Sequence, residues 1–212
     1  MKLYLSSYRV GNETNFLKDW NINNKKILVI PNALDVFADG ERKTNGILDK
    51  CKDLQDLGFE TEILDLRNYF NKENELKEYL QNYNSFYVLG GNVFVLRQAM
   101  KLSGFDNYLQ DISHFENYLY AGFSAGICVL AKDLHGIHLA DEPEKDPYNY
   151  GNIIWDGVGI IDYMPVPHYD TPEHPESHLM YDVVKYMQEN NLSYQTLHDG
   201  DVIIENFKNK TL

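Results

Sequence analysis

The sequence has 212 residues, of which 43% are hydrophobic and 24% are charged, a composition that argues against a mainly disordered chain. Thirty-two acidic residues against 19 basic ones give a formal net charge of −13, which leaves little to build a basic face and argues against nucleic acid and anionic membranes as partners. No apolar run approaches the ~18 residues of a membrane helix, and the N-terminus lacks a secretory pattern, so we expect a cytoplasmic protein.

Short apolar runs alternate with longer amphipathic stretches along the first two thirds of the chain. Strands are predicted at residues 3–5, 27–30, 61–66, 86–89 and 118–121. Helices are predicted at residues 47–57, 76–80, 93–100, 105–115 and 127–131. This alternation implies a mostly parallel sheet with helices on both faces, which is an α/β fold of the three-layer αβα type.

The last third of the chain follows a different pattern. Strands are expected at 157–163 and 202–205, with a helix at 179–190 between them. Residues 141–151 are acidic and rich in tyrosine, so we expect an exposed loop there. No linker or internal repeat interrupts the chain, and residues 1–212 are interpreted as one domain.

The sharpest motif is Gly122-Phe123-Ser124-Ala125-Gly126, which fits Gly-x-Ser-x-Gly directly between a predicted strand and a predicted helix. This is the context of a nucleophile elbow, where small residues on either side allow a sharp turn that exposes the serine hydroxyl. Ser124 is therefore a candidate nucleophile, and the Ala125 N–H a candidate donor to a developing oxyanion. The alternative is an ordinary tight turn between a strand and a helix.

A second glycine turn, Gly90-Gly91-Asn92, follows the preceding predicted strand. Ligands of α/β sheets bind outside the carboxyl ends of the strands, and glycines there let the backbone approach a substrate closely. We expect Gly90 to lie against the substrate and the Gly91 N–H to complete an oxyanion hole with that of Ala125. The alternative is again a plain turn.

A serine nucleophile needs a base and a group that orients it. Of the seven histidines, His168 follows an apolar run that ends at the same predicted sheet edge as Ser124, whereas surface or capping roles are expected for His114, His135 and His138. Three carboxylates compete for the orienting role. We favour Asp199, which lies in a turn between two apolar segments, over Asp170, which would have to fold back onto the histidine, and over Asp141, which lies in the acidic loop.

No metal or other cofactor is expected. His174 and His178 have a spacing that suggests zinc, but the glutamates around them fit no metalloprotease pattern and Pro175 disrupts a helix between them. The two cysteines, Cys51 and Cys128, are too few for a disulfide framework or a zinc knuckle and are expected to be small buried thiols.

Together these motifs resemble the peptidase E family, serine peptidases that include α-aspartyl dipeptidase and are related to cyanophycinase. The resemblance covers most of the chain. It rests on the N-terminal Leu-Ser-Ser, Pro31-Asn32-Ala33, Gly90-Gly91-Asn92, Gly122-Phe123-Ser124-Ala125-Gly126 and Pro167-His168-Tyr169. It implies a fold like that of the class I glutamine amidotransferases, which is flavodoxin-like, with serine in place of their cysteine.

The resemblance also implies an activity, which is hydrolysis of small peptides through an acyl-enzyme. Ser124 would be the nucleophile and His168 the base, with Gly91 and Ala125 as oxyanion donors and Asn92 shaping the turn or contacting substrate. Peptidase E has Glu-Gly where this chain has Asp199-Gly200.

A preference for an N-terminal aspartate would require a cation near the scissile bond, and Arg97 and Lys132 are the candidates nearest in sequence. Two alternatives share the fold: a catalytically silent binding or regulatory protein, and an esterase or amidohydrolase with the same triad.

Overall fold

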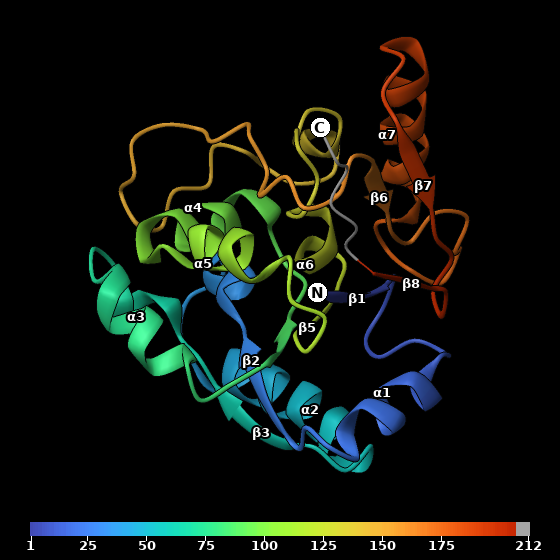
Figure 1. Cartoon of the computed structure of the whole chain (residues 1–212). Helices are drawn as coiled ribbons and strands as arrows, with labels where there is room; N and C mark the ends of the chain where they lie inside the picture. The colour runs from blue at the N-terminus through green and yellow to red at the C-terminus, as the bar shows by residue number, and fades with distance from the viewer. Residues whose placement is uncertain (207–212) are drawn as a thin grey trace.

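A six-stranded sheet runs through the middle of the molecule, which the computed structural model describes over residues 1–206 (Figure 1). The strand order is β3-β2-β4-β5-β1-β8. The strands are β1 (Lys2–Ser6), β2 (Lys26–Ile30), β3 (Glu60–Ile63), β4 (Ser85–Val88), β5 (Leu119–Phe123) and β8 (Val202–Asn206). All neighbours pair in parallel except β8, which is antiparallel to β1. The predicted α/β fold with a mostly parallel sheet is confirmed.

Helices cover both faces of this sheet (Figure 1). One face carries α1 (Thr14–Asn21) and α2 (Glu41–Asp56). The other face carries α3 (Glu73–Leu80), α4 (Val93–Ser103), α5 (Phe105–Ile112) and α6 (Ala125–Cys128). Short 3₁₀ helices, η1 (Asn32–Val36), η2 (Leu66–Tyr69) and η3 (Ile137–Leu139), follow β2, β3 and α6.

After the exposed Lys26, the four remaining residues of β2 are all apolar and buried. Ile27 and Val29 pack in the core under α1 and α2, together with Leu54 of α2, whereas Leu28 and Ile30 belong to the core on the opposite face. Successive side chains of a strand point to opposite faces, so the part of a strand that is covered on both sides is apolar at consecutive positions.

The last third of the chain forms a small unit beside the main sheet (Figure 1). Strands β6 (Met164–Val166) and β7 (Tyr194–Thr196) pair in parallel, and α7 (Ser177–Glu189) connects them. The short strand β7 and the two-turn helix α1, whose only buried side chains are Leu17 and Trp20, were not predicted. Both are brief elements with little periodicity to detect.

The predicted strand at 157–163 is wrong. Val158 and Ile160 are buried, which accounts for the apolar pattern, but their backbone N–H groups donate to the carbonyls of Val129 and Leu130 in the irregular segment after α6. That segment is also not the helix predicted at 127–131, because α6 ends at Cys128. Two irregular segments therefore satisfy each other's backbone groups without forming a ladder.

A buried ion pair joins α4 to α5. The Nη1 atom of Arg97 lies 2.9 Å from Oδ2 of Asp106, and the Nε atom donates to the carbonyl of Asp156 at 2.8 Å. Arg97 is 6% exposed and Asp106 is 3% exposed. If one partner of a buried ion pair is removed, the remaining charge is stabilised neither by an opposite charge nor by water.

We therefore expect Asp106→Ala to lower the free energy of unfolding by about 3–5 kcal/mol, measured by urea denaturation at pH 7. Asp111→Ala is the matched control, because Asp111 lies on the exposed side of α5, the helix that also carries Asp106, and pairs with Lys77 of α3. An exposed pair contributes at most about 1 kcal/mol. Equal losses in the two variants would contradict the importance of the buried pair.

Candidate active site

Ser124 occupies a strained turn between β5 and α6, with φ 51° and ψ −123°. L-residues rarely adopt this backbone conformation, and it is the one that a nucleophile elbow imposes. A Cβ atom would lie 2.3 Å from the Val88 carbonyl oxygen if added at Gly126 and 2.9 Å from it if added at Gly122. Both positions therefore require glycine, because the turn packs directly on the end of β4.

The glycine turn after β4 touches the serine turn. A Cβ atom at Gly90 would lie 2.8 Å from the Cβ of Ser124, and one at Gly91 would lie 2.4 Å from the Ala33 carbonyl oxygen. Gly91 also has φ 141°, which favours glycine. The backbone of Gly90 and Gly91 is thus held between Ser124 and the segment that follows β2.

Asn92 caps the N-terminus of α4, and its side chain forms hydrogen bonds within the fold. Its Oδ1 atom accepts from the Val95 N–H at 2.9 Å, and its Nδ2 donates to the Glu142 carbonyl at 3.0 Å. Beside it, the Asp141 carboxylate accepts from the Val93 N–H at 2.7 Å. Burial raises the pKa of Asp141 to about 7, and the Val93 hydrogen bond offsets part of this effect. The side chains of Asn92 and Asp141 therefore connect the N-terminus of α4 to the loop that contains Asp141 and Glu142.

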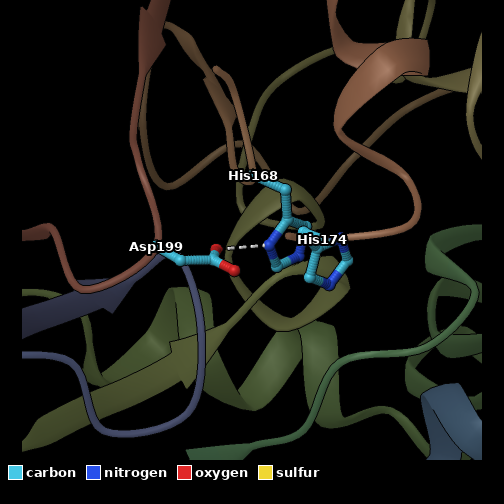
Figure 2. Close-up of side chains that lie close together, drawn as sticks. All are labelled: His168, His174 and Asp199. Atoms are coloured by element: carbon cyan, nitrogen blue, oxygen red, sulfur yellow. Dashed lines mark hydrogen bonds and ion pairs between the residues drawn. The ribbon is translucent and has the colours of Figure 1, made fainter. Parts of the chain in front are cut away.

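His168 and Asp199 are joined by a short hydrogen bond, with 2.6 Å between Nδ1 and Oδ1 (Figure 2). His168 follows β6 and is 1% exposed, and Asp199 lies in the turn between β7 and β8. Ser7, directly after β1, contacts both: its Oγ donates to Asp199 Oδ1 at 2.9 Å and accepts from the His168 N–H at 2.8 Å. Three segments that are distant in sequence meet at this pair.

The other two carboxylates considered for the histidine have different partners. Asp170 accepts from the Tyr181 hydroxyl at 2.7 Å, and its other oxygen lies 3.8 Å from Nε2 of His198 on the surface. Asp141 binds α4, as described above. Of the three candidates, the structure brings Asp199 to His168.

Ser7 is a residue of this site to which the sequence analysis assigned no role. Ser7 belongs to the N-terminal Leu-Ser-Ser segment and follows the first predicted strand, which ends at the same sheet edge as Ser124. That position was a usable signal, because the carboxyl ends of parallel strands lie together.

A pocket of about 280 Å³ joins Ser124 to His168. Its lining residues come mainly from the glycine turn after β4, the serine turn after β5, α2 and the loop before α7. They are Tyr8, Leu34, Gly46, Lys50, Leu89, Gly90, Gly91, Phe123, Ser124, His168, His174, Pro175 and Glu176. Lys50 is the cation among them. Neither Arg97, which is paired with Asp106, nor the exposed Lys132 is among the lining residues, so neither sequence-based candidate for a substrate-binding cation lies at this pocket.

Burial sets the protonation of His168. Desolvation lowers its pKa below the ordinary value of 6.5, the hydrogen bond to Asp199 opposes this shift, and the charge of His174 adds to it. The imidazole is thus kept neutral, and hence able to accept a proton, over the neutral pH range.

His168, His174 and Asp199 place ligand-type atoms within 4.8 Å of one another. The two imidazole rings are stacked, however, with centroids 3.6 Å apart and planes 3° from parallel. A bound ion lies in the plane of each imidazole that coordinates it, about 2.0–2.1 Å from the nitrogen. Two stacked parallel rings cannot direct nitrogens at one ion, so this arrangement suits a hydrogen-bonded base and not a chelate.

Comparison with known proteins defines the class of this protein as a peptidase, and therefore a hydrolase. The sequence profile described as peptidase family S51 matches residues 9–209. The chain belongs to peptidase family S51, the peptidase E family. Among residues 1–206, no helix combines the length and apolar character needed to cross a membrane.

The curated relatives carry names of the same class. The uncharacterized peptidase Lmo0363 of Listeria monocytogenes is 30% identical over 151 residues, which cover 71% of this chain and 68% of the relative. The uncharacterized peptidase PM1590 of Pasteurella multocida is 27% identical over 155 residues, 70% of this chain and 67% of the relative.

Two crystal structures share the fold. A Listeria monocytogenes EGD-e protein assigned as peptidase E superposes with a TM-score of 0.73 at 24% identity, over 98% of both chains. A peptidase from an acI-B1 actinobacterium superposes with a TM-score of 0.66 at 18% identity, over 97% of this chain and 83% of that one.

The hydrogen bond from His168 to Asp199 gives a prediction for the titration of His168, measured by NMR of its ring protons. The pKa of His168 should lie below 6.5, and Asp199→Asn should lower it further, because the carboxylate that favours the imidazolium is removed. The folded state thus binds this proton less tightly than the unfolded chain. His168 should therefore reduce the free energy of unfolding as the pH falls from 6.5 to the folded pKa.

Asp170→Asn is the matched control for this titration, because it removes a carboxylate two residues from His168 that bonds to Tyr181 instead. A shift in the control with none in Asp199→Asn would refute the pairing of His168 with Asp199.

Proposed function

We propose that this protein is a serine peptidase that cleaves small peptides through an acyl-enzyme, with Ser124 as nucleophile, His168 as general base and Asp199 as the orienting carboxylate. One observation carries the proposal: a buried histidine, hydrogen-bonded to a carboxylate, shares a pocket with a serine on a strained elbow. Membership of family S51 supports the same reading.

In the proposed reaction, the Ser124 Oγ attacks the carbonyl carbon of the scissile peptide bond while its proton passes to Nε2 of His168. The Nδ1–H of His168 donates to Asp199 Oδ1, which selects the tautomer with a free Nε2 and stabilises the imidazolium that forms. His168 then returns the proton to the departing amine. Water, deprotonated by the same histidine, attacks the ester and releases the acid and Ser124.

Backbone N–H groups are proposed to stabilise the tetrahedral intermediate. The Gly91 and Ala125 N–H groups belong to the two turns that touch each other beside Ser124. Donors fixed by the fold need no reorganisation as negative charge develops on the carbonyl oxygen. Gly90 is proposed to lie against the substrate, and the contacts of Asn92 support a role in shaping the turn.

The pocket supports a small substrate, and we propose a dipeptide. A volume of about 280 Å³ lies at the small end of ligand sites, which span roughly 300–1,000 Å³. Lys50 and Glu176 are its charged lining residues. A free dipeptide carries an ammonium group, which Glu176 would attract, and a carboxylate, which Lys50 would attract. An N-terminal aspartate would add a second carboxylate for the same lysine.

A serine-directed fluorophosphonate probe tests the nucleophile without knowledge of the substrate. The wild-type protein should be labelled at Ser124, Ser124→Ala should remain unlabelled, and His168→Gln should slow labelling by about 10³-fold or more. Ser124→Ala should unfold within about 1 kcal/mol of wild type, because it removes no core packing.

Ser193→Ala, which changes an exposed serine, is the matched control and should be labelled as wild type. Labelling that persists in Ser124→Ala would reject the nucleophile. A folded wild-type protein that is never labelled would favour a silent binding protein on this fold.

A panel of dipeptides and simple esters tests the substrate class and the role of Lys50. Lys50→Gln should lower kcat/KM for Asp-Leu by about 10- to 100-fold, as expected for loss of a charged hydrogen bond of about 1.5–3 kcal/mol, and should leave neutral esters unaffected.

Lys52→Gln serves as the control, since Lys52 lies on the same helix and pairs with Asp56, as Lys50 pairs with Asp49, but does not line the pocket. A uniform loss across all substrates would remove Lys50 from substrate recognition. Esters cleaved with no cleavage of any dipeptide would favour an esterase.

A further inference from the structure

A second histidine lies directly on the proposed base. The His174 ring stacks on that of His168 with centroids 3.6 Å apart and planes 3° from parallel (Figure 2). The Tyr8 ring contacts both imidazoles edge-on, with its centroid 6.1 Å from that of His168 and 5.8 Å from that of His174. His174 also lines the pocket that contains Ser124, and the mechanism described above assigns it no role.

Local hydrogen bonds hold His174 in this position. Its backbone N–H donates to the Thr171 carbonyl at 2.9 Å, and its Nδ1 accepts from the Glu176 N–H at 3.3 Å. The Thr171 hydroxyl in turn accepts from the Asp199 N–H at 3.0 Å. The loop that carries His174 is therefore hydrogen-bonded to the turn that carries Asp199. The two segments that contact His168 are thus held together.

These two neighbours restrain His168 in complementary ways. The hydrogen bond from Nδ1 to Asp199 fixes one edge of the imidazole but leaves the ring free to tilt about that bond. A ring stacked on its face removes this tilt. Proton transfer from a serine depends on such alignment, because misplacement of about 1 Å can cost about 100-fold in rate.

We propose that His174 is a positioning residue for His168: its stacked ring holds the base in the plane that presents Nε2 to the serine proton. The inference rests on the proposed function, since it requires His168 to be the base.

The charges around His168 act in opposite directions. Asp199, in the turn before β8, and Glu176, in the loop before α7, favour a positive charge on the ring. Burial and the charge of His174 oppose it, while Tyr8 from the segment after β1 presents only its ring. Removing the imidazole of His174 should therefore make His168 easier to protonate.

The pH dependence of fluorophosphonate labelling tests the proposal with two variants. His174→Phe keeps a flat ring but cannot carry charge, so its maximal labelling rate should stay within about threefold of wild type, while the loss of rate at low pH should begin at higher pH. His174→Ala removes the ring, so its maximal rate should fall by about 10- to 100-fold. A merely structural residue would not move the pH profile.

His135→Ala is the matched control, because His135 stacks in the same way on Trp155, with centroids 4.2 Å apart, away from the pocket. It should change neither the maximal rate nor the pH profile.

A labelled wild type with His174→Ala unchanged in rate and profile would overturn this inference alone. So would a His174→Phe variant as slow as His174→Ala with an unshifted profile. Wild-type protein that is not labelled at Ser124 would overturn the proposed function and this inference with it.

Discussion

The hydrogen bonds among His168, Asp199 and Ser7 are the constraint on which the rest of the site depends. A histidine that is 1% exposed is removed from bulk water, so its Nδ1 needs a partner within the protein. Asp199 supplies it at 2.6 Å, and Ser7 bonds to both residues. The network forms only when the ends of β1 and β6 and the turn before β8 meet, so it also requires the β6–α7–β7 unit to dock against the main sheet.

Strained backbone conformations occur where the proposed chemistry takes place. Ser124, His168 and Gly91 all have positive φ, at 51°, 57° and 141°. Non-glycine residues in such conformations cost of order 1–3 kcal/mol each and persist only where their surroundings over-determine them. Here the surroundings are a sheet buried on both faces and turns packed on the Val88 and Ala33 carbonyls. The rigid core thus supports turns that would not hold their shape alone.

The pocket combines elements that the sheet topology brings together. The glycine turn and the serine turn lie at the carboxyl ends of β4 and β5, where α/β proteins bind ligands. Lys50 reaches it from α2, on one face of the sheet, while His174 and Glu176 arrive in the loop before α7. The site therefore places a lysine and a glutamate around a small cavity, which suits a substrate that carries both charges.

The sequence by itself determined the α/β class and the elbow around Ser124, because both depend on short-range rules. Alternation of apolar runs defines buried strands, and the steric crowding of a turn is contained within the five residues from Gly122 to Gly126. It also pointed to His168, through its position after an apolar run. It favoured Asp199 over Asp141 and Asp170 only from the position of its turn, because a hydrogen bond across 31 residues leaves no local pattern.

Other features were decided by tertiary structure alone. The apolar segment at 157–163 is irregular because its N–H groups pair with the turn after α6, a partner that periodicity does not reveal. Ser7, Lys50 and the ring of His174 gain their places at the site only when distant segments pack together. The stacking of His174 on His168 depends on where the loop before α7 lies, which only the three-dimensional packing of the chain sets.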